Sequence, residues 1–427
     1  MKTAIASVRG RRIWDSRGRP TVEAEIELEG GARGRAIAPS GASTGSAEAR
    51  DRRDGGQAFG GLDVTGALAA VNGEIAKALV GCDAADQEGL DRSLIALDGT
   101  KDKSRLGGNA LIAVSMAAAH AAAAAEGVPL WRYLAGSREC RLPLPEIQIF
   151  GGGAHAGQRV DVQDFMVIAV GADDYVQALD WTAEVYRAAG ALMADAGLLQ
   201  GVADEGGFWP AFANNEAAIE MTVRAIKRAG FTPGRDLALS LDIAASQFGR
   251  GGRYRLARDG RELSSNELAE TLLGWLARYP IVAIEDPLAE DDLDGLARFT
   301  RKAGPRVQVV GDDCLVTSAE RIRAAAARGA CNATLLKPNQ AGTLTEAKEA
   351  LAAARAAGWG AIVSARSGET EDATIVHLAV GWGVDQLKVG SFSRSERMAK
   401  WNEGLRIADL LGRADLPPRT SFPWRKN

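Results

Sequence analysis

The chain has 427 residues, of which 46% are hydrophobic and 25% are charged, and its formal net charge is −4 at pH 7. This length predicts one large domain and a smaller one, and the composition is that of a soluble globular protein. Because a slightly acidic chain offers no basic surface to a phosphate backbone, we expect no nucleic-acid partner.

The first part of the chain combines a strand pattern with helical patterns. Residues 21–31 alternate polar and apolar side chains and end in a Gly-Gly pair, which predicts a strand and a hairpin turn. From about Gly61 to Leu134 the pattern is helical and rich in alanine. We therefore predict an N-terminal α+β domain over residues 1–135 that caps the rest of the protein.

The most apolar stretch of the chain, residues 111–125, predicts a buried helix. It is short for a membrane span, rich in alanine, and interrupted by Ser115 and His120. We therefore expect no membrane association.

The cysteine pattern favours a reducing compartment. None of the 4 cysteines belongs to a Cys-x-x-Cys pair, which argues against a thiolate zinc site and against a disulfide framework. Arg9, Arg11 and Arg12 interrupt the N-terminal segment before a long apolar stretch, so we expect no secretory signal and a cytoplasmic location.

From about Leu142 onward, short apolar runs alternate with helical segments such as 215–230 and 345–358. The apolar runs are FMVIAV, LALSLD, IVAIED, VQVVGD, ATLLK, AIVSAR and DQLKVG. This alternation predicts an α/β fold over residues 136–427, either a β/α barrel or a doubly wound sheet. The arginine-rich segment 250–263 lies between two turn signals and predicts a solvated hairpin.

The positions of the charged residues favour the barrel. A charge stands at the carboxyl end of one run after another: Asp242, Glu285, Asp312, Lys337, Arg366 and Lys388. In a β/α barrel all these ends open onto one face, which carries the active site. Buried charges are costly unless they are paired or bind metal, so the set predicts a functional site.

Carboxylates and lysines in this set indicate a particular chemistry. Asp242, Glu285 and Asp312 offer hard oxygen ligands, which favour Mg²⁺. A lysine close to a divalent cation and to a second ammonium loses its proton more easily, so Lys337 or Lys388 could act as a base. Removal of a proton next to a carboxylate needs such a site, because the enolate product carries two negative charges.

The segment 363-VSARSGETED-372 supplies a further candidate. Arg366 offers a planar fork of donors, and Ser367 with the following backbone N–H groups offers more. A surface ion pair of Arg366 with Glu369 or Glu371 is the alternative. Beside two lysines, we favour the binding of a phosphate or a carboxylate.

At this point the sequence resembles the enolase family, over nearly the whole chain. The motifs that carry the resemblance follow the family's order: 15-DSRGRPTVE-23, 39-PSGASTG-45, 97-LDGTKDKSRLGGNA-110, 204-DEGGF-208, 241-LDIAAS-246, 284-IEDPLAEDD-292, 310-VGDD-313, 335-LLKPNQAGTLTE-346, 366-RSGETED-372 and 394-RSER-397. The resemblance implies a small phosphorylated carboxylate as substrate, two Mg²⁺ per active site, and a homodimer or a ring of dimers.

The resemblance also implies roles for individual residues. Asp242, Glu285 and Asp312 match the ligands of the tightly held Mg²⁺, and Ser43 matches a lid residue that helps to bind the second. Lys337 matches the base that takes the C2 proton, and Lys388 matches the lysine that binds the substrate carboxylate. Arg366 and Ser367 match the phosphate clamp. The remaining matches are on the side of the C3 hydroxyl: the acid Glu205, the loop histidine His155, and Gln163-Asp164, at the place of a substrate-binding Gln and a catalytic Glu.

The chain departs from the family's pattern on the side that handles the C3 hydroxyl. Enolases have His-Arg-Ser at Ala365-Arg366-Ser367, Gln-Glu-Phe at Gln163-Asp164-Phe165, Asn-Gly-Gly at Gly151-Gly152-Gly153, Gly-Asp-Glu at Ala203-Asp204-Glu205, and Ala-Ala-Ser-Glu-Phe at Ala244-Ala245-Ser246-Gln247-Phe248. Ala365, Asp164 and Gly151 are each smaller than the residue they replace, which predicts a roomier pocket.

These departures leave three hypotheses. A specialised relative would keep the enolate chemistry and accept a larger group or a second, phosphonate substrate; carboxyphosphonoenolpyruvate synthase of phosphonate and phosphinate antibiotic pathways has that profile. An ordinary glycolytic enolase would convert 2-phosphoglycerate to phosphoenolpyruvate and water. A non-catalytic binding protein on the same scaffold is the third, but the retained Lys337, Lys388 and metal carboxylates argue against it.

Overall fold

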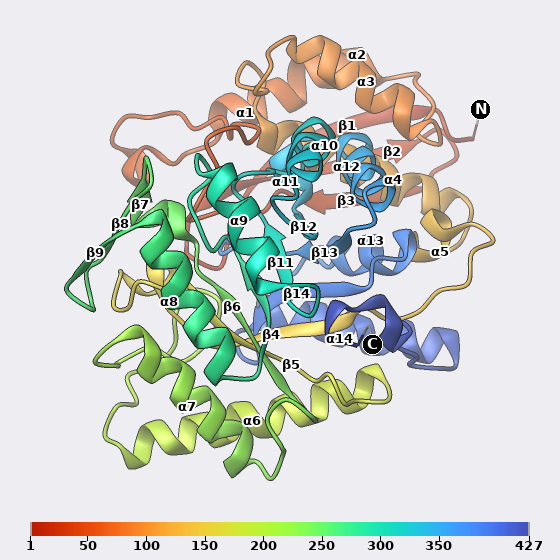
Figure 1. The fold of residues 1–427 in the computed structure, drawn as a ribbon. Helices are drawn as coiled ribbons and strands as arrows, with labels where there is room; N and C mark the ends of the chain where they lie inside the picture. The colour runs from red at the N-terminus through yellow and green to blue at the C-terminus, as the bar shows by residue number, and fades with distance from the viewer. Residues whose placement is uncertain (1, 426–427) are drawn as a thin grey trace.

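The computed structural model describes residues 2–425 and consists of a smaller N-terminal domain and a barrel (Figure 1). The N-terminal domain contains an antiparallel sheet of β1 (Ile5–Trp14), β2 (Pro20–Leu28) and β3 (Arg33–Ile37). Its helices are α1 (Thr65–Ala70), α2 (Ala76–Leu79), α3 (Gln87–Asp98), α4 (Gly108–Ala125) and α5 (Leu130–Ala135). The predicted strand, hairpin turn and helical region are confirmed.

Helix α4 packs against β2 and β3, and this contact explains its alanine content. A Cβ on Gly34 of β3 would lie 2.1 Å from the backbone N of Ala121, so sheet and helix approach too closely for larger side chains. By length and composition α4 could cross a membrane, but 83% of it is buried inside the protein. The predicted buried helix is confirmed.

The second domain is a closed barrel, as predicted, with strand order β10-β11-β12-β13-β14-β4-β5-β6. The strands are β4 (Leu144–Gly151), β5 (Asp164–Ile168), β6 (Ala238–Asp242), β10 (Ile281–Glu285), β11 (Gln308–Gly311), β12 (Ala333–Leu336), β13 (Gly360–Ser364) and β14 (Gln386–Ser391). Strand β4 was not among the predicted strands.

Strand β5 differs from the expected alternation of strand and helix. Only the short helical turn η3 (Gly153–Ala156) and its flanking loop connect β4 to β5, and β5 runs antiparallel to both β4 and β6. The amino end of β5 therefore lies at the same rim as the carboxyl ends of the other strands. In register, Asp164 pairs with Gly151 on one side and with Asp242 on the other.

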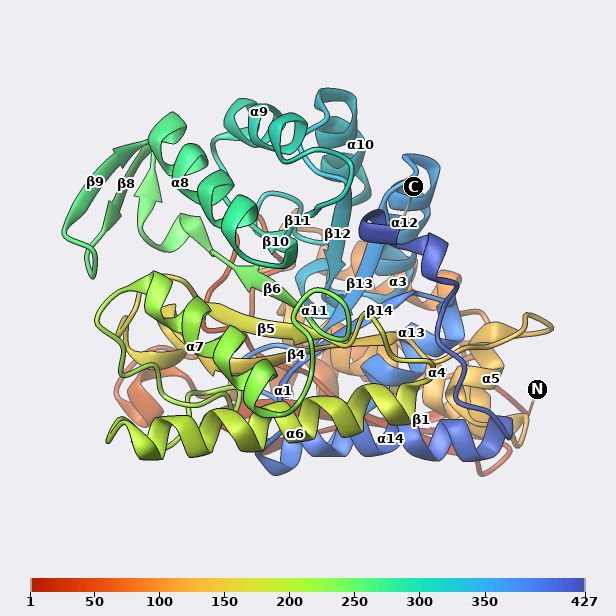
Figure 2. The same ribbon diagram turned by 60° about the horizontal axis from the view of Figure 1, so that its bottom comes forward.

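Helices surround the barrel, and α6 and α14 run alongside one another (Figure 2). They are α6 (Tyr175–Asp195), α7 (Asn215–Arg228), α8 (Ser265–Arg278), α9 (Leu293–Ala303), α10 (Ala319–Arg328), α11 (Pro338–Ala341), α12 (Leu344–Ala356), α13 (Thr374–Trp382) and α14 (Ser395–Leu411). Polar side chains cap several of their amino ends; Asn214 accepts from the N–H of Ala217, and Ser264 forms a capping box with Glu267.

The predicted arginine-rich hairpin is also confirmed. It forms the small antiparallel sheet of β7 (Gly249–Arg250), β8 (Arg253–Leu256) and β9 (Arg261–Ser264), which projects from the barrel next to α8 (Figures 1 and 2).

The N-terminal domain covers the carboxyl rim of the barrel. Ser40 and Gly368 exchange backbone hydrogen bonds of 2.9 and 2.8 Å, and the N–H of Ser16 donates to the carbonyl of Glu369 at 2.7 Å. Asp372 accepts from the N–H of Ile37 at 2.8 Å. These contacts hold residues 40–48, which we call the lid loop, over the strand ends.

Candidate active site

The structure brings the charged strand ends together, and all of them are buried. The Nζ atom of Lys388 lies 3.0 Å from Asp242 Oδ2 and 2.7 Å from Glu285 Oε2. The Nζ atom of Lys337 lies 2.5 Å from Asp312 Oδ2. We call these five residues the metal-and-base side of the site.

The carboxylates of this side fit a magnesium ion. Burial and the neighbouring carboxylate of Asp242 raise the pKa of Glu285 well above its ordinary value. Among the described residues, Glu285 Oε1 is buried and has no hydrogen-bond partner. A buried acceptor without a partner is costly, and a hard cation is the ligand that a cluster of carboxylate oxygens prefers.

The acidic groups with the closest spacing are not the predicted ligand set. In the described residues, Asp286, Asp312 and Asp313 form one group with ligand atoms within 4.8 Å of one another. Asp286 accepts from the backbone N–H groups of Asp312 and Asp313 at 2.9 and 2.8 Å, so its oxygens already shape the loop. Asp242 and Glu285 are not in that group, and Lys388 bridges the two. We keep Asp242, Glu285 and Asp312 as the proposed ligands.

Both lysines of the site are paired with carboxylates, and this pairing raises the pKa of each lysine. Burial alone would lower the pKa of Lys337, but the Asp312 carboxylate outweighs it and raises the pKa. Burial would also lower the pKa of Lys388, but the carboxylates of Asp242 and Glu285 outweigh it and raise this pKa well above its ordinary value. The sequence ties a lowered lysine pKa to a bound divalent cation, which would neutralise these same carboxylates, so the lowered pKa stays a prediction.

The predicted phosphate clamp lies against the lid loop. Arg366 donates to Glu48 Oε2 at 2.9 Å and to the carbonyl oxygen of Ser43 at 3.0 Å. The hydroxyl of Ser367 accepts from Arg17 at 3.0 Å. Arg366 is thus paired with Glu48 rather than with the predicted alternatives Glu369 or Glu371, and its pairing links the lid loop to the barrel.

The remaining predicted residues form what we call the leaving-group side: His155, Gln163, Asp164, Glu205 and Ala365. Asp164 Oδ1 accepts from Gln148 and lies 3.1 Å from His155 Nδ1, and its Oδ2 lies 3.5 Å from Lys388 Nζ. His155 Nε2 lies 3.7 Å from Glu205 Oε1.

Protonation on this side follows from these contacts. Burial would lower the pKa of His155, but Glu205 and Asp164 raise it. Burial would raise the pKa of Asp164, but His155 and Lys388 hold it well below its ordinary value. The pair therefore favours a charged imidazole beside a charged carboxylate, next to the acid that the sequence predicts for the leaving group.

The pocket is not roomier at Gly151, contrary to the prediction. A Cβ at Gly151 would lie 2.7 Å from the Cβ of Ala203 and 3.3 Å from the amide of Gln148. The methyl group of Ala203, itself a departure from the family's pattern, fills the space. The cavity that both sides of the site enclose, with Ala365 in its wall, is about 10 Å³, or about one water molecule.

Sequence reasoning missed the residues that hold the Arg-Ser-Gly segment in place. Fully buried Arg397 donates to the backbone carbonyls of Arg366, Val389 and Ser367 at 2.7, 2.8 and 2.6 Å. Lys400 pairs with Glu369 at 3.0 Å. Arg397 belongs to 394-RSER-397, one of the motifs that carry the resemblance to enolases. The spacing of the motif does not show whether a helical arginine donates to buried backbone carbonyls or lies on the surface.

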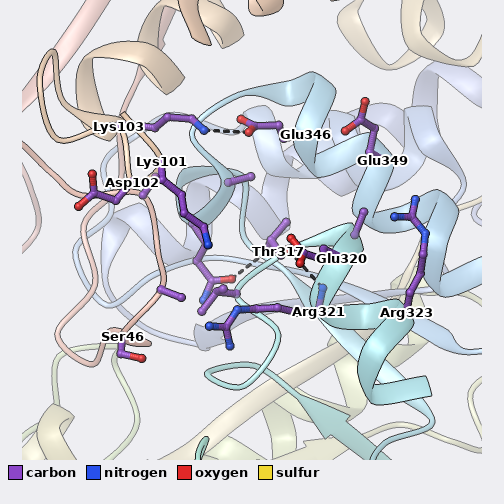
Figure 3. Close-up of a pocket in the computed structure, with 17 residues that line it drawn as sticks. Ser46, Lys101, Asp102, Lys103, Thr317, Glu320, Arg321, Arg323, Glu346 and Glu349 are labelled. Atoms are coloured by element: carbon purple, nitrogen blue, oxygen red, sulfur yellow. Dashed lines mark hydrogen bonds and ion pairs between the residues drawn. The ribbon is translucent and has the colours of Figure 1, made fainter. Parts of the chain in front are cut away.

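A much larger cavity of about 1000 Å³ lies beside the site, between the lid loop, residues 101–103 and the starts of α10 and α12 (Figure 3). Gln340 lines this cavity and also donates to Asp312 Oδ1 at 2.9 Å, so it links the cavity wall to a proposed metal ligand. The side chains that line the larger cavity carry charges of both signs, and Lys103 pairs with Glu346 there at 2.9 Å. None of the predicted catalytic or metal residues lines it, so the chemistry belongs to the smaller cavity.

A capped β/α barrel with clustered carboxylates and two lysines at its carboxyl rim is the architecture of a magnesium-dependent enzyme. Comparison with known families agrees: the model described as "Enolase, N-terminal domain" matches residues 5–134. The model described as "Enolase, C-terminal TIM barrel domain" matches residues 139–416. The chain belongs to the enolase family and is a lyase of the enolase superfamily.

Proposed function

We propose that this protein removes the C2 proton of 2-phosphoglycerate or a close phosphorylated analogue and forms an enolpyruvate product, as a specialised relative of enolase. The specialised relative that we propose is an enzyme such as carboxyphosphonoenolpyruvate synthase of phosphonate and phosphinate antibiotic biosynthesis. A cytoplasmic location and a homodimer or a ring of dimers stay predictions.

In this proposal each side of the site has its own step. Lys337 takes the C2 proton, Lys388 binds the substrate carboxylate, and Arg366 with Ser367 binds the phosphoryl group. Glu205 gives a proton to the C3 hydroxyl, which leaves as water while the electron pair of the C2–H bond becomes the new double bond. Asp242, Glu285 and Asp312 would hold Mg²⁺, with Ser43 for a second ion, and bound Mg²⁺ supplies the positive charge that the enolate needs.

One observation supports specialisation over random drift: three of the departures, Gly151, Ala203 and Asp164, contact each other or share a partner. Gly151 lies against Ala203, and both Gly151 and Asp164 contact Gln148. Gln247 donates to Gln163, the neighbour of Asp164. Substitutions that accumulate at random have no reason to pair in this way, whereas a remodelled half-site requires it.

The test compares proton removal with dehydration. With 2-phosphoglycerate, we expect ready exchange of the C2 hydrogen with solvent deuterium and slow formation of phosphoenolpyruvate, lower by about 10²- to 10⁴-fold than in an ordinary enolase. An analogue that carries a carboxyl group on phosphorus should lose water faster. Phosphoenolpyruvate formation at about 10 to 10³ per second would instead make this protein an ordinary enolase.

A further inference from the structure

Two glutamine side chains connect the η3 loop to Asp242, one of the proposed metal ligands. The backbone N–H of Ala154 donates to Gln247 Oε1 at 2.9 Å. Gln247 Nε2 donates to Gln163 Oε1, and Gln163 Nε2 donates to Asp242 Oδ2 at 2.8 Å. Because Ala154 is next to His155, this chain of bonds joins the leaving-group side to the metal-and-base side.

The two ends of the chain fix the direction of every bond in it. A backbone N–H can only donate, and a carboxylate that binds a cation carries no proton and can only accept. Each amide between them must therefore accept on the loop side and donate on the metal side. Glutamine at position 247 can do both, whereas a carboxylate can accept from Ala154 but has no hydrogen for Gln163 Oε1.

The loop backbone is shaped to make this contact. Gly153 has a φ of +45°, and a Cβ there would lie 3.0 Å from Gln247 Oε1 and 3.2 Å from the Cβ of Gln163. A glycine at this position lets both amides approach the loop. The second contact of Gln247, with Gln158 Nε2 at 3.2 Å, comes from an exposed side chain and is free to exchange with water.

We propose that Gln247 is a positioning residue that couples docking of the η3 loop, and with it the placement of His155, to the metal ligand Asp242. A cation bound to Asp242 would fix the orientation of this carboxylate, which orients Gln163, then Gln247, then the loop. By reciprocity a docked loop strengthens metal binding by the same factor. The proposal goes beyond the proposed function, and it rests on it only in taking Asp242 as a metal ligand.

The experiment measures this coupling in the full chain without substrate. Hydrogen-exchange mass spectrometry follows the peptide that contains residues 151–160 with and without Mg²⁺, and titration calorimetry gives the Mg²⁺ affinity. In the unmodified protein, Mg²⁺ should slow exchange of the loop. In Gln247→Glu, the effect of Mg²⁺ on the loop should disappear and Mg²⁺ affinity should fall about 10-fold, because a buried amide loses its partner.

A matched control separates the hydrogen bonds from the added charge. Gln158→Glu puts the same charge into the η3 loop itself, on an exposed side chain that can turn from Gln247 into water, and should keep the effect of Mg²⁺ on exchange. Gln247→Met keeps the length of the side chain without either hydrogen bond and should behave like Gln247→Glu. General destabilisation would speed exchange equally with and without Mg²⁺, so it would not imitate lost coupling.

The proposal is overturned if both Gln247 variants keep a Mg²⁺-dependent slowing of the loop within about 2-fold of the unmodified protein. It is also overturned if loop exchange in the unmodified protein does not respond to saturating Mg²⁺. Failure of the metal site itself has another signature: Glu285→Gln would then bind Mg²⁺ as tightly as the unmodified protein.

Discussion

On the metal-and-base side, the ammonium groups of Lys388 and Lys337 pair directly with carboxylates, whereas the leaving-group side adds amide and loop-backbone hydrogen bonds to the direct contacts of His155 with Asp164 and Glu205. The first side keeps every residue that the family's pattern requires, and the departures fall on the second. A buried charge in direct contact with two others cannot change alone, because its partners would be left unpaired. On the leaving-group side, Asp164 keeps the charge of the family's Glu, and the uncharged departures Gly151 and Ala203 lie against each other.

The largest effect is expected at the metal carboxylates, which the difference between the two sides requires to be irreplaceable. We expect Glu285→Gln to lower turnover by roughly 10⁴-fold or more, since two carboxylates do not hold the ion productively. Calorimetric titration with Mg²⁺ and a turnover assay check this. Asp291→Asn, an exposed carboxylate beyond the same strand, is the control. Full activity in Glu285→Gln, or in excess chelator, would contradict the metal assignment.

The next test addresses the base. Lys337→Ala should lose exchange of the C2 hydrogen with solvent deuterium, by about 10²- to 10⁴-fold, because no other group is proposed to accept that proton. Lys101→Ala, in the neighbouring cavity of Figure 3, removes a lysine without touching the site and should exchange normally. Exchange in Lys337→Ala at the unmodified rate would place the base elsewhere.

The leaving-group side can be tested by reversing its departures. Ala365→His with Asp164→Glu should raise phosphoenolpyruvate formation from 2-phosphoglycerate, by about 10-fold or more if acid catalysis is the impaired step. The same variant should process the analogue with a larger phosphoryl group more slowly. A spectrophotometric assay with both substrates measures the change. If the two rates stay in the same ratio, these residues do not determine the reaction.

The smallest expected effect tests whether departures come in pairs. Gly151→Ala should lower the free energy of unfolding by about 1–3 kcal/mol, because its methyl group would overlap that of Ala203. Combining it with Ala203→Gly should restore most of the loss. Urea unfolding of the single and double variants gives the coupling. Equal losses in Gly151→Ala with and without Ala203→Gly would mean that the two positions are independent.

Much of the architecture could be predicted because it depends on local patterns. Apolar runs ending in charges predicted β6, β10 and the strands that follow them, and the alternation in residues 21–31 predicted β2. The antiparallel course of β5 could not be predicted, since a buried strand has the same pattern in either direction. Its direction decides that Asp164, at its amino end, reaches the same rim as Asp242 at the carboxyl end of β6.

The order of residues is enough to show which carboxylates, lysines and arginines stand at strand ends, and which positions depart from the family's pattern. Their protonation and their partners follow from the way distant parts of the chain pack together. Asp312 pairs with Lys337 and raises its pKa, Arg366 pairs with distant Glu48, and Ala203 fills the space at Gly151. The physical reason is that charge interaction and packing depend on distances between residues far apart in the chain, which no local pattern contains.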